Sequence, residues 1–120
     1  MRKRIMDREI LESVGIDYAE AEERFSGSTE LFEKFLEEMA ENNILKPLKN
    51  ALNECDAMAA FIVAHTLKGN FGNLSLKPLY EIVAPLVEEL RRENIVEAQK
   101  LYIELEKEYE VIVDGIRRAK

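Results

Sequence analysis

The stretch Asn94–Ile116, NIVEAQKLYIELEKEYEVIVDGI, decides the fold class. Its apolar residues recur at alternating steps of three and four, which places them on one face of a long helix. Such a face is typical of the seam along which antiparallel helices pack in a bundle. Its members are Ile95, Ala98, Tyr102, Leu105, Tyr109, Ile112 and Ile116. We therefore expect one long helix here, with its partner helices earlier in the chain.

The segments before this helix also show helical periodicity. Residues 4–14 predict a short helix that ends at Gly15, and Asp17 is placed to cap a second one before the turn at residues 26–28. Ser28 then starts a longer helical segment, which we expect to kink or break near residues 42–43 because Pro47 lacks an N–H donor. Its expected core side contains Phe32, Phe35, Leu36, Met39, Leu45, Leu48 and Leu52, whereas Glu33 is expected to face water.

Two further helices follow before the last one. Asp56 is placed to cap one helix, and Pro78 lies where the first turn of the next helix tolerates proline. The connections are short, so consecutive helices must be antiparallel neighbours. We expect an all-α single domain over residues 1–120, in which 28–120 form an antiparallel four-helix bundle and 1–27 add one or two short helices packed alongside. The composition agrees, because 120 residues contain only five glycines and three prolines.

Charge and cysteine content exclude several classes of protein. A formal net charge of −7 disfavours nucleic acid and anionic membranes as partners. The longest uncharged apolar stretch, Ala57–Ala64, is far shorter than the roughly 20 residues that span a bilayer. The basic start is broken at once by residues 5–9, so we expect no export, and the single Cys55 suggests a reducing, cytoplasmic location. Cys55 is interpreted as a small filler near a helix cap and is assigned no role.

The chain has one histidine, within Ala64-His65-Thr66-Leu67-Lys68-Gly69-Asn70-Phe71-Gly72-Asn73. Helical spacing places His65 opposite the expected core side, on the same face as Lys68, Gly69 and Gly72. Glycine inside a helix costs about 1 kcal/mol relative to alanine, so two of them on an exposed face indicate that something approaches the backbone closely. The expected core side consists of Ala60, Val63, Ala64, Leu67, Phe71 and Leu74.

This arrangement suits phosphoryl chemistry. An exposed imidazole has a reference pKa of about 6.5 and is a good nucleophile near neutral pH, so a ring nitrogen of His65 could accept a phosphoryl group. The ammonium of Lys68, three residues along the helix, could offer that group a charge-assisted hydrogen bond. The sequence contains no glycine-rich phosphate loop, no metal-ligand cluster and no acidic neighbour at Thr66. We therefore expect a recipient of phosphoryl groups and not a self-phosphorylating enzyme.

These residues resemble the histidine-containing phosphotransfer (HPt) domain of bacterial phosphorelays. The likeness rests on His-x-x-Lys-Gly in a bundle helix, with Gly15-Ile16-Asp17 before it and residues 74–79 after it, and it covers residues 15–115. It implies that His65 takes a phosphoryl group from a receiver-domain aspartate and passes it to another receiver domain. Lys68 would offset phosphate charge, and Gly69 would let the receiver close over the imidazole. Ser75 departs from the family, which usually has a second glycine there.

The resemblance also implies partners and cofactors. Receiver domains of response regulators, a hybrid histidine kinase, or both would be the partners of a monomeric protein. The chain would have no cofactor of its own, because Mg²⁺ would belong to the partner receiver. The start at Met1 and the lack of a linker at Lys120 favour a free-standing protein.

Two questions stay open at this stage. Met58, Phe61 and Ile62 lie near the His65 side, where the N-terminal helix covers some of them, or they form an apolar docking patch together with Gly72, or both hold in part. The function also has alternatives. One is a non-catalytic helical interaction module in which His65 is never phosphorylated, and the other is the detached substrate domain of a chemotaxis-type histidine kinase.

Overall fold

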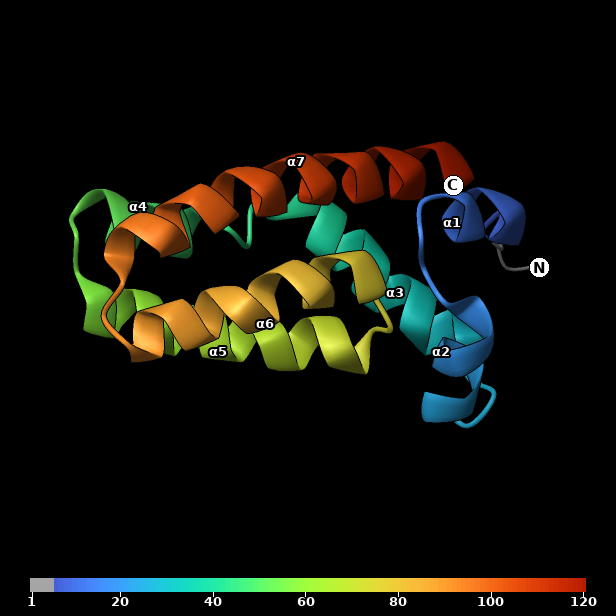
Figure 1. Ribbon diagram of the computed structural model, residues 1–120. Helices are drawn as coiled ribbons and strands as arrows, with labels where there is room; N and C mark the ends of the chain where they lie inside the picture. Colours follow the sequence, from blue (N-terminus) through green and yellow to red (C-terminus); the bar gives the residue numbers. More distant parts are fainter. Residues whose placement is uncertain (1–5) are drawn as a thin grey trace.

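The computed structural model describes residues 6–120, and this part of the chain forms helices joined by short turns (Figure 1). The helices are α1 (Arg8–Ser13), α2 (Tyr18–Arg24), α3 (Thr29–Glu41), α4 (Lys46–Asn53), α5 (Ala57–Asn73), α6 (Lys77–Arg91) and α7 (Ile95–Ala119). Within residues 6–120 the extended pairing is limited to one isolated antiparallel bridge between Ile16 and Leu76.

The helices from α3 onward form an antiparallel four-helix bundle, in which α3 and α4 together take the place of one helix. Helix α6 packs on both α5 and α7, and the ring closes where α4 contacts α5 and where α3 and α4 contact α7. The short helices lie at one end of the bundle, α1 against α7 and α2 against α3 (Figure 1). The expected all-α bundle with short N-terminal helices alongside is confirmed.

The seam that the last helix predicts is confirmed. Of its members only Ile95, at the start of α7, is half-buried, and the others are buried. They meet fully buried side chains from each of the other bundle helices, among them Phe32, Leu36, Leu48, Phe71, Leu79 and Leu86.

The expected interruption near residues 42–43 is a full break between α3 and α4. Pro47 lies in the first turn of α4, where its missing N–H is not needed. The end of α3 exposes carbonyl groups that α7 satisfies, because the Tyr109 hydroxyl donates to Met39 O at 2.8 Å and Arg117 Nη2 donates to Ala40 O at 3.2 Å. The last helix therefore stabilises the break from across the bundle.

Five helices end in a residue with left-handed backbone geometry. Gly15 has this conformation after α1, and Ser26, Cys55, Ser75 and Glu93 have it after α2, α4, α5 and α6, with φ between 51° and 62°. At α4, Cys55 N donates to Leu52 O and Asp56 N donates to Ala51 O, which is the hydrogen-bond pattern of a Schellman motif. Cys55 is exposed and forms a helix end, so its place in the fold is a backbone turn and not a packed filler.

Three expectations about the N-terminal half are wrong or need adjustment. The first helix begins at Arg8, because the Asp7 carboxylate accepts from the N–H groups of Glu9 and Ile10; residues 6 and 7 are not helical, and positions 4 and 5 of the expected helix lie outside the described residues. Phe35 is 41% exposed and stays outside the core, where its ring lies 6.0 Å from that of Phe25.

Glu33 is the clearest correction, since it is buried and does not face water. Its carboxylate accepts from the Tyr18 hydroxyl at 2.7 Å and from Met6 N at 3.1 Å, which satisfies the charge that burial would otherwise penalise. Burial, together with the hydrogen bond to Glu33, raises the pKa of Tyr18 to about 12. Glu33 therefore connects α3 to α2 and to the segment before α1.

The contact between α1 and α7 depends on Gly115, where an added Cβ would lie 2.8 Å from both methyl groups of Val14. We predict that Gly115→Ala lowers the free energy of unfolding, because overpacking of about 1–3 kcal/mol outweighs the gain in helix propensity of about 1 kcal/mol. In a Val14→Ala background both methyl groups are absent and only the Cβ of residue 14 remains close, at 3.3 Å, so the same change should cost less. Denaturant unfolding of the four proteins measures this coupling, and an equal effect in both backgrounds would contradict it.

Candidate functional site on helix α5

Helix α5 is anchored on one side only. Asp56 caps its start by accepting from Ala59 N at 3.0 Å. The predicted core side is confirmed, since Ala60, Ala64, Leu67 and Phe71 are buried. Val63 and Leu74 at the margins of this side are half-buried. The opposite side of α5 faces solvent and carries the only histidine.

His65 is exposed, as the helical spacing predicts. Its ring lies 5.9 Å from the ring of Phe61, one turn earlier, at an interplanar angle of 39°. Gly69, one turn later, is also exposed, and a Cβ added there would meet nothing within 4 Å. The backbone beside the imidazole is therefore open to a large partner.

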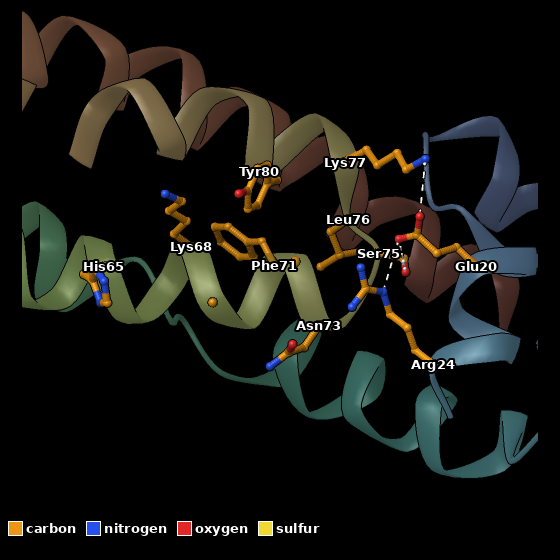
Figure 2. Close-up of a pocket in the computed structure, with 12 residues that line it drawn as sticks. Glu20, Arg24, His65, Lys68, Phe71, Asn73, Ser75, Leu76, Lys77 and Tyr80 are labelled. Carbon is orange, nitrogen blue, oxygen red and sulfur yellow. Dashed lines mark hydrogen bonds and ion pairs between the residues drawn. The ribbon is translucent and has the colours of Figure 1, made fainter. Parts of the chain in front are cut away.

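A groove of about 500 Å³ starts at His65 and follows the last turns of α5 to the N-terminal helices (Figure 2). Lys68, Gly69, Gly72 and Tyr80 line the part nearer to His65. The far part is lined by Glu20, Arg24, Asn73, Ser75, Leu76 and Lys77. Glu20 and Arg24 are additions that the sequence analysis missed.

The far end of the groove is closed by a polar network centred on Glu20. The Ser75 hydroxyl donates to Glu20 Oε1 at 2.8 Å, and Arg24 Nε donates to the same oxygen at 3.2 Å (Figure 2). Lys77 Nζ lies 2.8 Å from Asp17 Oδ2 and 3.6 Å from Glu20 Oε2. The hydrogen bond from Ser75, with smaller contributions from Arg24 and Lys77, lowers the pKa of Glu20, and the hydrogen bond from Lys77 lowers that of Asp17. Both carboxylates stay ionised near neutral pH, and the network ties α2 to the turn between α5 and α6.

Ser75 ends helix α5 at a position where a glycine is usual. With φ at 56°, it adopts the left-handed conformation that ends α5, and its N–H donates to Gly72 O at 3.2 Å. Leu76 N completes the Schellman motif by donating to Phe71 O at 3.0 Å. The serine side chain is buried in the network with Glu20, so this departure from the family pattern adds a contact and leaves the helix end defined.

Lys68 shares the side of His65, but its side chain extends toward α6 (Figure 2). Its Nζ lies 5.9 Å from the centroid of the Tyr80 ring. Gly72 is half-buried beside the same ring, and a Cβ added there would lie 3.5 Å from Tyr80 Cε2. The structure thus brings Lys68 and Gly72 together with Tyr80, which the sequence analysis did not single out.

Met58 and Ile62 are 76% and 63% exposed, so the alternative in which the N-terminal helix covers them is wrong. Phe61 is half-buried, and the Arg91 guanidinium from α6 lies 5.0 Å above its ring. Together with Leu90 and Glu93 these residues line a shallow depression on the N-terminal side of His65. Phe61 joins this depression to the imidazole.

Between residues 6 and 120, no three His, Cys, Asp or Glu side chains are grouped to hold a metal ion. No helix in the same range has the length and apolar character needed to cross a membrane.

Comparison with known protein families identifies a family that covers most of the chain. The family model of the Hpt domain matches residues 30–115, which is most of the chain and includes His65, Lys68 and Gly69. No curated protein and no solved structure matches the sequence. The matched region begins inside α3, so α1 and α2 lie before it.

The open space at Gly69 generates a prediction about stability. Gly69→Gln should raise the free energy of unfolding by up to about 1 kcal/mol, because glutamine is the better helix former and the new side chain meets no neighbour. Thermal and denaturant unfolding measure this change, with Gly115→Ala as the matched helical glycine whose substitution should have the opposite sign. A loss of stability in Gly69→Gln would show that the bundle needs a glycine there.

Proposed function

The chain belongs to the Hpt domain family, and on this premise we propose that His65 is a phosphoacceptor in a multistep phosphorelay. Hpt domains are phosphocarrier modules of two-component signalling that work with receiver domains and kinases. In our proposal His65 accepts a phosphoryl group from the aspartate of one receiver domain and passes it to another receiver domain. The chain acts as a cytoplasmic monomer and needs no nucleotide or metal of its own.

The observation that carries this proposal is the exposure of the only imidazole beside an open backbone. His65 lies on the solvent side of α5. One turn later, Gly69 has no side chain, and the space that a side chain would fill there is empty. Transfer between an aspartate and a histidine requires that both reach the same phosphorus atom. A rigid helix with a bare face next to the nucleophile meets this requirement.

The transfer step moves one phosphoryl group between two side chains. The lone pair of a ring nitrogen of neutral His65 attacks phosphorus while the bond from phosphorus to the aspartyl oxygen of the partner breaks. A nitrogen–phosphorus bond forms, and the aspartate leaves as a carboxylate. The other ring nitrogen keeps its proton or releases it to water. The onward step is the reverse reaction with a second receiver, whose Mg²⁺ would balance the charge at its aspartate.

The surfaces on either side of His65 support docking of a large partner. The exposed Met58 and Ile62, with Phe61 between them and the imidazole, offer apolar area on one side. On the other side Gly69 permits close approach, and Lys68 supplies a cation for the transferred group.

The direct test is phosphorylation at His65. Incubation with a phosphorylated receiver domain should label the chain with a phosphoramidate, which is labile in acid and stable in base, and His65→Gln should take no label. Measurement of label stability across pH identifies the bond. A label that is stable in acid and lost in alkali, or one that survives in His65→Gln, would place the acceptor on a carboxylate or hydroxyl group and contradict the proposal.

A second prediction concerns Lys68, whose ammonium should stabilise the phosphorylated product. Lys68→Ala should slow transfer or shorten the lifetime of the phosphohistidine, while the free energy of unfolding changes by only a few tenths of a kcal/mol, roughly the size expected for a side chain outside the core. Transfer kinetics and unfolding of the same protein separate the two effects. Unchanged rate and lifetime would refute this role.

The Gly69→Gln variant also tests the docking geometry. Its side chain should occupy space that the partner needs, so transfer and receiver binding should be lost although the protein is at least as stable. Gly115→Ala serves as the control, since it lies on α7 against Val14 and should lower stability while transfer continues. Retained receiver affinity in Gly69→Gln would remove Gly69 from the docking surface.

A further inference from the structure

Tyr80 is a partly exposed aromatic side chain that lines the groove beside His65. It lies in the first turn of α6, is 40% exposed, and leans against α5 at Gly72, where a Cβ would sit 3.5 Å from its ring. The ammonium of Lys68 lies 5.9 Å from its centroid, within the range of a cation–π contact. Figure 2 shows the Lys68 side chain extending from α5 toward α6, whereas His65 points away from α6.

The contact between the Lys68 ammonium and the Tyr80 ring has no competing ion pair within residues 6–120. Glu20, the acidic side chain that lines the groove, binds Ser75 and Arg24, and Asp17 next to the groove binds Lys77. Within residues 6–120 no carboxylate forms an ion pair with Lys68. The ring face is therefore what directs the ammonium toward α6.

We propose that Tyr80 is a positioning residue that holds Lys68 over its ring while His65 is unmodified and releases it when His65 carries a phosphoryl group. This inference rests on the proposed phosphoacceptor role of His65. A charge-assisted hydrogen bond to a phosphoryl oxygen is stronger than an exposed cation–π contact. When His65 is phosphorylated, the Lys68 ammonium therefore binds the phosphoryl group in preference to the Tyr80 ring. The ring stabilises only the unmodified state and thereby lowers the tendency of the chain to retain the phosphoryl group.

The size of the effect follows from the strength of the contact. For an exposed cation–π pair, the Lys68 ammonium should prefer the position over the Tyr80 ring to positions free in solvent by roughly two- to fivefold. Loss of the ring should shift the phosphorylation equilibrium toward phosphohistidine by a similar factor. A carrier must both accept and donate a phosphoryl group. A factor of this size would shift the equilibrium between unmodified and phosphorylated His65, and so the balance between the two directions of transfer.

The first measurement tests the contact in the unmodified protein. In the wild-type chain, the ring current of Tyr80 should move the ε-methylene proton resonance of Lys68 upfield, and Tyr80→Phe should keep this shift. Tyr80→Leu, which retains apolar bulk without a ring, should abolish it. Phosphorylation of the wild-type chain with phosphoramidate should abolish it too. A shift that is absent from the unmodified protein, or that persists after phosphorylation, overturns the inference.

The second measurement tests the equilibrium. Equimolar ¹⁵N-labelled wild-type chain and an unlabelled variant share limiting phosphoramidate, with free imidazole as the phosphoryl shuttle, and intact mass gives the partition of the phosphoryl group. Tyr80→Leu should hold about two- to fivefold more than the wild type, and Tyr80→Phe should hold an equal amount.

The Lys68→Ala background separates positioning from a structural effect. Without the ammonium there is nothing for the ring to hold, so Tyr80→Leu with Lys68→Ala should partition like Lys68→Ala alone. An equal partition of Tyr80→Leu and wild type, or a preference that persists without Lys68, overturns the role of Tyr80 while the phosphoacceptor proposal stands. A wild-type chain that takes no label at His65 overturns both.

Discussion

The one-sided burial of α5 is the constraint on which the rest of the site depends. Ala60, Ala64, Leu67 and Phe71 fill the interior, and because a helix is rigid, the opposite side must face water. The orientation of His65 is thus set by the hydrophobic effect acting on its neighbours and not by any contact of its own. Substitutions among these four buried residues would therefore shift the position of the His65 imidazole indirectly.

Parts of the chain outside α5 shape the surroundings of His65. Helix α6 contributes Tyr80 on one side and Arg91 over Phe61 on the other. Helix α2, which precedes the region matched by the Hpt model, contributes Glu20 and Arg24 at the end of the groove. The surface around His65 is therefore assembled from three helices, of which α5 carries the His-x-x-Lys-Gly motif.

Most of the fold and the orientation of His65 could be predicted because both depend on periodicity. Helical spacing identified the seam of α7 and the buried side of α5, and Pro47 marked the break between α3 and α4. Contacts between distant residues were beyond this reasoning. The sequence pattern around Glu33 predicts a surface residue, whereas its carboxylate is buried and accepts a hydrogen bond from Tyr18. Ser75 donates a hydrogen bond to Glu20, which lies 55 positions away in the sequence.

The same limit explains Lys68. Its spacing from His65 along one helix correctly gave the shared side, but the direction of a long side chain is decided by what the neighbouring helix offers. That neighbour is Tyr80, and no pattern within α5 contains it.

The ends of four helices could not be predicted from the sequence either, because Ser26, Cys55, Ser75 and Glu93 adopt a conformation for which glycine would be the ordinary signal. These four residues also mean that the chain lies below the stability its fold permits, since each side chain costs about 1–2 kcal/mol in the left-handed region. Ser26, Cys55 and Glu93 lie in turns where glycine would recover part of that cost. Glycine at these three turns would therefore offset destabilising substitutions elsewhere in the chain, including substitutions on the surface around His65.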